Sequence, residues 1–362
     1  MNIAKTVSGG YDMRGIRSIS ALSASIVLLS LKPSFSEEKS FPLLANTELR
    51  ISGGISAFWM QTLDRKENPS LYSVTDISAA NLEISKPSSS TLPIGFALNV
   101  GRRAVPTVGI EYEPFVSESK FELQSAYITL DIDKLNIMAG KIPAIYGWES
   151  PFTYQNANIQ RGLVWWAEFN SFFNGFRLTY SLLDTLKVIG GVNDWNTKDG
   201  KYALEFGISS RPLSNLLANF TLIYNNRNDK YPIRLYSLAL SYSKGNTTIT
   251  LNPDIITVPD SKTGTNGNGT GTGFGVALFI SQKISENLST GIRFEYVKAD
   301  KKFDYYGIGK DNSAVTSTFT LKYSKSGFFI RGEASYVKTD KPTYERNKDT
   351  QFRLLAETGF VF

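Results

Sequence analysis

The chain has 362 residues, of which 41% are hydrophobic and 20% are charged, so an intrinsically disordered protein is excluded. It contains no cysteine and no histidine, which excludes disulfide frameworks, thiolate or imidazole metal sites, and catalysis by a histidine base. The formal charge is +6, but basic and acidic residues are interspersed rather than gathered in a stripe. We therefore expect no metal, no cofactor and no nucleic-acid partner.

The first 36 residues have the pattern of a secretory signal peptide. Two arginines precede an apolar run at residues 19–31, and Ser34 and Ser36 are small residues at the minus-three and minus-one positions of a cleavage site. The run is shorter than the roughly 20 apolar residues that a spanning helix needs, which disfavours an uncleaved anchor. The start codon is left open, because residues 1–12 add little to the pattern. Cleavage after Ser36 leaves 35 basic and 32 acidic side chains, an excess of three that favours a slight anion preference in a channel.

From residue 47 onward, apolar and polar residues alternate with a period of two, which predicts β-strands. The alternation defines sixteen segments: 47–60, 75–85, 92–101, 124–132, 135–142, 173–183, 185–193, 201–210, 216–225, 234–243, 246–252, 272–283, 288–298, 314–323, 327–337 and 350–362. The second segment is weak and the region around Trp165 is ambiguous, so the pattern limits the count only to about 14–18 strands.

The connections between these segments alternate in length. Those after even-numbered strands are short, such as 133–134, whereas those after odd-numbered strands are mostly long and polar, such as 143–172 and 253–271. Short turns at one rim and long loops at the other are typical of outer-membrane barrels. We therefore predict an all-β fold, a transmembrane antiparallel up-and-down β-barrel at residues 47–362 with short periplasmic turns and long extracellular loops. Residues 37–46 would precede it as a periplasmic segment.

The last strand is amphipathic and ends in two aromatic residues, Phe360 and Phe362. Such a strand resembles the assembly signal of bacterial outer-membrane barrels, in which the last strand also pairs with the first. The resemblance implies a place in the bacterial outer membrane, with membrane lipid and the barrel-assembly machinery as partners.

The polar positions of the strands are expected to face a water-filled interior, because the apolar positions face lipid. We predict that the charged residues at inward positions line a pore: Arg50, Arg177, Glu205, Arg293, Glu295, Lys322, Arg331, Glu333, Arg353 and Glu357. A barrel of about sixteen strands is wide enough for an aqueous lumen. The alternative is that Arg331 with Glu333, and Arg293 with Glu295, form structural ion pairs that stiffen the wall.

The connection at 143–172 is too long and too aromatic for an ordinary surface loop. Because aromatic side chains favour burial, we predict that part of it folds against the wall or into the lumen and narrows the pore. The residues of this constriction would be Tyr146, Trp148, Glu149, Arg161, Trp165, Trp166 and Glu168. The alternative places Trp165 and Trp166 in the outer aromatic belt of the membrane interface.

The same region carries the motifs of a known family. These are Leu123-Gln124-Ser125-Ala126-Tyr127-Ile128, Gly140-Lys141-Ile142-Pro143, Tyr146-Gly147-Trp148-Glu149-Ser150-Pro151, Gln160-Arg161-Gly162-Leu163, Gly175-Phe176-Arg177-Leu178-Thr179-Tyr180 and Val192-Asn193-Asp194-Trp195. Over residues 120–196 the chain resembles the core of the OmpL-like β-barrel porin family. It departs from the family pattern at Asp194, where the family usually has Gly, and at Gln160, where it usually has Ser. The resemblance implies an outer-membrane pore and transfers neither a solute nor catalytic residues.

We therefore expect a porin for the passive diffusion of small hydrophilic solutes or ions. An enzyme is not expected, because the outer-membrane barrel enzymes known to us use a catalytic histidine, which this chain lacks. The alternative is a plugged structural or adhesive barrel that works through its extracellular loops. The sequence leaves open which solute passes, whether the lumen is open, and whether three barrels associate into a homotrimer.

Overall fold

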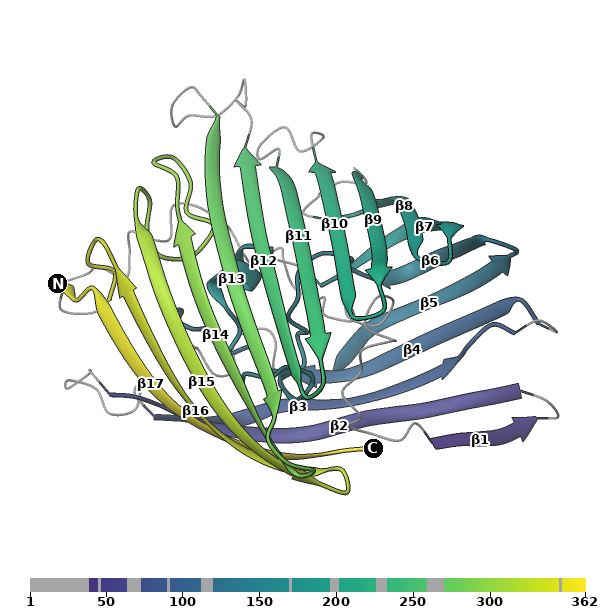
Figure 1. The fold of residues 1–362 in the computed structure, drawn as a ribbon, viewed down its shortest axis with the longest axis horizontal. Coiled ribbons are helices and arrows are strands. Elements are labelled where there is room, and N and C mark those ends of the chain that lie inside the picture. The colour runs from purple at the N-terminus through teal and green to yellow at the C-terminus, as the bar shows by residue number, and fades with distance from the viewer. Residues whose placement is uncertain are drawn as a thin grey trace.

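The structure, a computed structural model, describes residues 39–44, 47–63, 73–89, 92–111, 120–168, 171–195, 202–225, 233–258, 270–344 and 347–362. Sixteen antiparallel strands form a closed barrel in which each strand pairs with its neighbours in the chain (Figure 1). They are β2 (Thr47–Thr62), β3 (Ser73–Lys86), β4 (Ile94–Arg103), β5 (Glu122–Ile132), β6 (Leu135–Pro143), β7 (Phe172–Leu183), β8 (Leu186–Asn193), β9 (Ala203–Leu213), β10 (Leu216–Asn225), β11 (Ile233–Lys244), β12 (Thr247–Val258), β13 (Gly271–Lys283), β14 (Leu288–Lys298), β15 (Ser313–Lys325), β16 (Phe328–Thr339) and β17 (Thr350–Val361). All sixteen predicted strands are confirmed. The predicted signal peptide lies outside the described residues.

The barrel closes where the last strand meets the first. Strand β17 pairs with β2, with Thr358 opposite Ala57. The backbone of Phe362 continues this seam, because its carbonyl accepts a hydrogen bond from the Gly53 N–H at 3.0 Å and its N–H donates to the Gly53 carbonyl at 3.1 Å. Closure leaves no free strand edge within the sixteen-stranded ring, which is the condition for a sheet to cross a membrane.

Two features of the sheet differ from the predicted pattern. A short strand, β1 (Lys39–Leu44), precedes the barrel and pairs with the start of β2, in the segment that the sequence left without structure. Strand β12 continues beyond Pro253 to Val258, where the prediction ended it at residue 252. The alternation survives the proline, because Asn252 and Asp254 on either side are buried inside the barrel while Ile255 is exposed outside.

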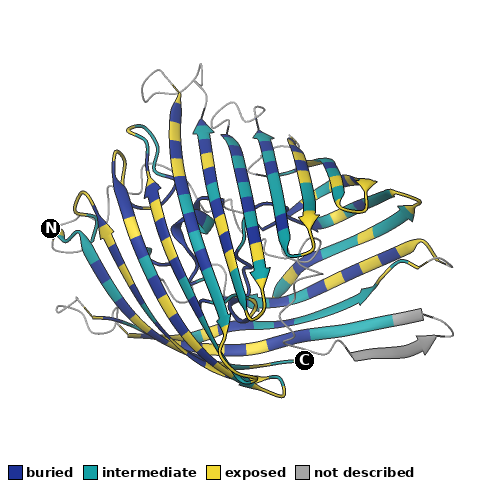
Figure 2. Cartoon of the chain, in the orientation of Figure 1, coloured by how far each residue is buried: buried dark blue, intermediate teal, exposed yellow. Residues whose placement is uncertain are grey.

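The two faces of the wall differ as the alternation predicts. Figure 2 shows buried and exposed residues alternating along the strands. On β2, Ile55 is 57% exposed on the outer face, while its neighbour Ser56 is buried on the inner face. On β14, Phe294 and Tyr296 are likewise exposed outside, between buried inward charges. An apolar outer band and polar inner positions are the arrangement that lipid requires of a barrel.

Two short helices lie in the long connection between β6 and β7: the 3₁₀-helix η4 (Thr153–Gln155) and the α-helix α2 (Leu163–Glu168). Helix α2 packs against β12, β13 and β14, so this connection lies inside the barrel rather than above it. None of the helices in the described part of the chain is long and apolar enough to cross a membrane.

Candidate functional site

The candidate site is the inserted loop, by which we mean residues 144–168, together with the inner wall that it contacts. The loop reaches widely separated strands: its Ile145 carbonyl accepts a hydrogen bond from Thr221 of β10 at 3.0 Å. Its Tyr154 hydroxyl donates to Asn81 of β3 at 2.6 Å. Its Asn158 amide donates to the hydroxyl of Thr320 on β15 at 2.8 Å. The loop therefore spans the cross-section of the barrel, as the aromatic composition of the connection predicts.

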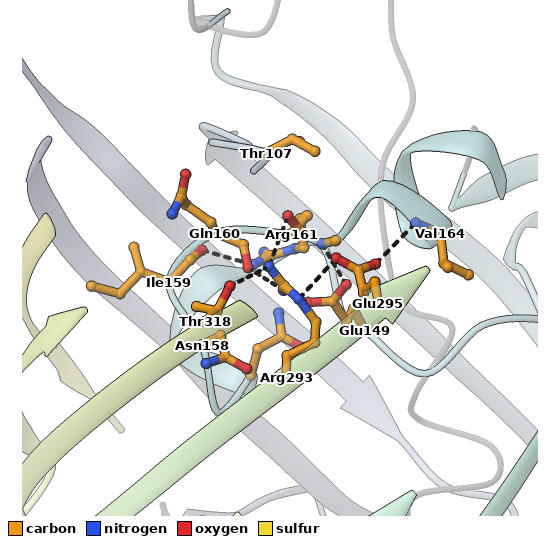
Figure 3. Close-up of polar contacts among 12 residues, drawn as sticks. Thr107, Glu149, Asn158, Ile159, Gln160, Arg161, Val164, Arg293, Glu295 and Thr318 are labelled. Carbon is orange, nitrogen blue, oxygen red and sulfur yellow. Dashed lines mark hydrogen bonds and ion pairs between the residues drawn. The ribbon is translucent and has the colours of Figure 1, made fainter. Parts of the chain in front are cut away.

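Arg293 of β14 is the centre of the largest polar cluster between wall and loop (Figure 3). Its guanidinium donates at 2.6 Å to Glu149 of the loop and at 2.6 Å to the carbonyl of Gln160. It also donates at 3.2 Å to the carbonyl of Arg161, and it lies 3.3 Å from Glu295 on its own strand. The Arg293 side chain is fully buried, so one wall arginine holds two carboxylates and two loop carbonyls away from water.

Two wall glutamates bind the backbone and hydroxyl groups of the loop. Glu333 accepts hydrogen bonds from the N–H groups of Ile159 and Gln160, the second at 2.9 Å. Glu357 accepts from the hydroxyl of Thr153 and is paired with Arg331 of the neighbouring strand. Hydrogen bonds to a carboxylate are stronger than those to a neutral acceptor, so these contacts fix the loop against β16 and β17.

The two ion pairs that the sequence suggested have different outcomes. Arg293 and Glu295 do pair, at 3.3 Å. The pair between Arg331 and Glu333 is wrong, because Arg331 binds Glu357, which lies directly opposite it on β17, with 2.7 Å between Nε and Oε2. Directly opposite residues have Cβ atoms about 5 Å apart, whereas residues two apart on one strand are separated by about 6.6 Å of chain.

Other predicted pore residues anchor the ends of the loop and its neighbours. Arg177 is paired with Glu205 and donates at 2.6 Å to the carbonyl of Pro143, where the loop begins. Arg353 donates at 2.8 Å to the carbonyl of Thr107, in the connection after β4. Of the ten predicted pore-lining side chains, Arg50 alone is partly exposed rather than buried. Their inward positions agree with the prediction, and their role in lining a pore stays a prediction.

Lys322, another of these ten, has an aromatic partner. Its ammonium nitrogen lies 4.7 Å from the centre of the Phe329 ring on β16. A cation above an aromatic face is stabilised even where it is desolvated.

Apolar side chains of the inserted loop pack into a core inside the barrel, which we call the lumen core. Tyr146 contacts Phe173 with 6.0 Å between ring centres, and Trp148 packs against the edge of the cluster. The buried members are Val108, Ala144, Tyr146, Leu163, Val164, Ala167, Phe173, Trp195, Ala203, Ile223, Ile233, Leu235, Ile256, Val258, Ala277, Phe279, Val297, Ala299, Tyr305, Tyr306, Ile308, Ala314 and Val337. Four connections and nine strands thus share one hydrophobic core, which sequence alternation alone could not reveal.

Trp165 and Trp166 both belong to α2, inside the barrel. The guanidinium carbon of Arg161 lies 5.8 Å from the centre of the Trp165 ring. The alternative that placed these two residues in the outer aromatic belt is therefore wrong. Burial lowers the pKa of the Arg161 guanidinium to about 9, which still leaves it charged at neutral pH.

Glu168 at the end of α2 lies beside a wall carboxylate that the sequence analysis missed, Asp254 of β12. The hydroxyl of Ser237 donates to Glu168 at 3.3 Å, and the amide of Asn252 donates to Asp254 at 2.7 Å. Burial, followed by the nearby Asp254, raises the pKa of Glu168 well above its ordinary value. Asp254 was missed because the predicted strand ended before Pro253, although its inward parity was readable from the sequence.

Inward side chains nearer the short-turn rim are partly exposed, in contrast to those under the inserted loop. They are polar and come from strands around the barrel: Ser85, Thr129, Asn136, Ser181, Ser209, Asn219, Ser281 and Ser289. The inner wall between the loop and the short-turn rim is therefore polar and partly exposed. In the described part of the chain, no three acidic side chains are grouped so that they could hold a metal ion.

Comparisons with known proteins agree with this architecture. The family model described as "Putative beta-barrel porin-2, OmpL-like" matches residues 49–362, well beyond the motifs at 120–196. A search of curated proteins found no match. Among solved structures, the chain is similar to OmpT, an outer membrane protein of Vibrio cholerae, with a TM-score of 0.62 and 10% identity over 90% of this chain and 100% of that one. It is also similar to an anion-selective porin from Comamonas acidovorans, with a TM-score of 0.60 and 9% identity over 88% and 100% of the two chains.

Proposed function

Because the chain belongs to the OmpL-like β-barrel porin family, we propose that its barrel passes small hydrophilic solutes or ions by diffusion down their gradient. The protein is a channel-forming porin of the bacterial outer membrane, with its apolar outer band in contact with membrane lipid. Diffusion needs no catalytic residue and no cofactor, in keeping with a chain that has no histidine and no cysteine. We propose that the protein is not an enzyme.

The observation that carries the proposal is the inserted loop across a barrel whose inner wall near the short-turn rim is polar and partly exposed. Contacts from Ile145 to β10, from Tyr154 to β3 and from Asn158 to β15 support the proposal that the loop forms the constriction of the lumen. The loop residues Glu149 and Arg161 would set the local field there. The rate of solute passage would then depend on how far the inserted loop undocks from the inner wall of the barrel.

The interior charges bear on ion selectivity. The buried charged side chains among the described residues comprise seven basic and seven acidic groups, so the lumen near the loop has no excess of either sign. The slight anion preference therefore rests on the excess of three basic residues in the mature chain. Reversal potentials in a salt gradient test it, and clear cation selectivity would remove it.

The decisive experiment is single-channel recording in planar bilayers with the mature chain and with a variant lacking residues 147–168. We expect a steady current in the parent and a larger current in the variant, because the deletion removes the constriction. Heat-dependent mobility on gels and circular dichroism identify preparations in which the barrel is folded. The absence of current from both folded proteins would contradict the proposed function.

A second candidate, a plugged barrel that works through its extracellular loops, is favoured by the lumen core. Buried side chains such as Tyr146, Leu163 and Tyr306 join the inserted loop to other extracellular connections. The same recordings separate the two candidates. No current in the parent together with current in the deletion variant would identify a plug.

We also infer how the protein reaches and occupies the membrane. Residues 1–36 would direct export and be cleaved, and Phe360 with Phe362 would be recognised by the barrel-assembly machinery. Sequencing of the mature amino terminus tests the first inference. Three barrels would form a homotrimer, an assembly whose counterpart is a trimer form of OmpT of Vibrio cholerae. The mass of the detergent-solubilised protein, measured by light scattering, tests the trimer.

A further inference from the structure

A small pocket lies on the outside of the barrel at the extracellular rim, away from the inserted loop. Its volume is about 300 Å³. It is lined by the start of β13, the end of β14 and the connection that follows β14: Thr270, Thr272, Phe274, Lys298, Ala299, Asp300, Lys301, Lys302 and Asp311. Three of these nine residues are lysines, which is an unusual density of one charge in so small a space.

The pocket sits where the apolar outer band ends. Phe274 lines the pocket and is 39% exposed on the outer face, and Lys298 lies directly opposite Phe274 in the ladder between β13 and β14. Tyr296, two residues before Lys298 on β14 and further from the rim, is exposed on the same outer face. Aromatic side chains on the lipid face mark the interface with lipid headgroups, so the lysines lie at headgroup level.

The acidic residues of this region are already used by the loop itself. Asp300 accepts hydrogen bonds from the N–H groups of Thr272 at 3.1 Å and Lys302 at 2.8 Å, which ties the connection to β13. Asp311 is paired with Lys341 at 2.7 Å. Asp300 keeps its negative charge, because its partners are neutral N–H groups, whereas the charge of Asp311 is balanced by Lys341. The three lysines of the pocket therefore outnumber its carboxylates.

The three lysines outnumber the two aspartates that line the pocket, which leaves an excess of positive charge there. Lys298 and Lys301 are exposed and form no ion pair with any residue that the structure describes. The hydrogen bond from Lys341, and after it the charges of Lys301 and Lys298, lower the pKa of Asp311. The field of these lysines therefore reaches across the pocket.

We propose that this pocket binds the phosphorylated headgroup of an outer-leaflet lipid. The ammonium groups of Lys298, Lys301 and Lys302 would contact the phosphate, and the acyl chains would lie along Phe274 and Tyr296 on the apolar band. An ammonium suits this task as a compact point charge that approaches a phosphate from several directions. Such a lipid would hold the connection after β14, which also contributes Tyr305 and Tyr306 to the lumen core.

Native mass spectrometry of the detergent-solubilised full chain tests the proposal, with phosphatidic acid as the probe and diacylglycerol as its neutral counterpart. Each lysine near an anionic lipid headgroup contributes about a fivefold gain in affinity, so the K298A/K301A/K302A variant should bind phosphatidic acid about a hundredfold more weakly. The matched control is K244A/K283A/K325A, which removes three exposed lysines at the opposite rim and should bind like the parent. Binding to the parent should weaken as salt is raised.

Three results would overturn the proposal. Equal losses in both triple variants would mean that net charge alone is responsible. Displacement of the lipid by millimolar inorganic phosphate would identify a site for free phosphate instead of a lipid. Unchanged lipid binding in K298A/K301A/K302A would show that the pocket is not the binding site. Heat-dependent mobility on gels checks that this variant is folded. If the triple variant misfolds, the single variant K298Q replaces it.

Discussion

Replacing Arg293 by methionine is expected to release the inserted loop without unfolding the barrel. The substitution keeps an unbranched, though shorter, side chain but leaves Glu149, which Arg293 contacts at 2.6 Å, buried without its cation. It also removes the donor to the Gln160 carbonyl at 2.6 Å. Glu295 keeps hydrogen bonds from Val164 at 3.1 Å and Thr316 at 2.8 Å, so most of the loss falls on the loop.

The size of the effect follows from the burial of the pair. Removing one partner of a buried ion pair costs about 3–5 kcal/mol, because the other charge remains desolvated. The strands retain their ladders, so this free energy is lost from the docking of the loop rather than from the barrel. At about 1.4 kcal/mol for each factor of ten, the docking equilibrium should shift by a factor of about 10² to 10⁴.

Two readouts measure this shift. Single-channel recordings should show a larger open current, or longer open periods, in R293M than in the parent. Trypsin should cut the loop after Arg161 in R293M, whereas in the parent the Arg161 side chain is fully buried and protected. The R234M variant is the control, because Arg234 lies on the outer half-exposed face of β11, 4.9 Å from the Tyr224 ring centre, and does not face the loop. Unchanged current together with a protected Arg161 in R293M would refute the assignment of the loop's anchoring to this cluster.

Three further predictions address the loop and the seam. Burial raises the pKa of Glu168, so docking should be strongest below pH 4.5 and weaken as pH rises through the raised value; the single-channel current should therefore rise with pH in the parent, and rise less in E168Q, which keeps only Asp254 of this carboxyl pair. A Cβ built at Gly291 lies 2.7 Å from the Ala157 Cβ, about 1 Å closer than in an average disulfide, so the loop needs to move outward only slightly for A157C/G291C to be oxidised. The chain has no other cysteine, so this disulfide should lock the loop to β14, and reduction should free it. Deleting Phe362 should slow barrel assembly in pulse-chase experiments, whereas F328A, another exposed aromatic residue, should assemble normally.

The strands were predictable because lipid and water impose opposite demands on the two faces of each one. On β14, Arg293 and Glu295 point inward while Phe294 and Tyr296 point outward, a pattern readable from four consecutive residues. The predicted strand ended too early at β12 because proline lacks the N–H that a β-ladder uses. The effect of the proline is local, and the alternation of inward and outward side chains resumes directly after it. Strand β1 gave no alternation to recognise.

The partners inside the barrel were not predictable from one sequence. That Arg331 meets Glu357 depends on the register between β16 and β17, which a hydrophobic pattern does not specify to one pair of residues. Glu333 turns to the backbone N–H groups of the inserted loop, a contact that only the path of that loop creates. The aromatic content of the loop indicated that it is buried, but only the structure identifies the strands that it contacts.

The inserted loop is held by two kinds of contact that oppose its release differently. Buried ion pairs add little net stability, because desolvation offsets their attraction, but they specify one docked position. The lumen core supplies a non-directional driving force in proportion to the apolar area that it hides from water. Truncating Leu163, a fully buried core residue, to alanine should therefore weaken docking by about 2–5 kcal/mol.

The double variant E149Q/R293M separates these contributions. It removes both charges of the Arg293–Glu149 pair and leaves Glu295 without its cation, as R293M does. Because Glu149 is no longer a buried unpaired charge, the loop should stay more protected from trypsin than in R293M. If the lumen core supplies most of the docking free energy, L163A will expose the loop more than the double variant does. The reverse order would mean that the charges supply docking free energy in addition to setting the docked position of the loop. The single-channel current would then change with salt as strongly as with core substitutions.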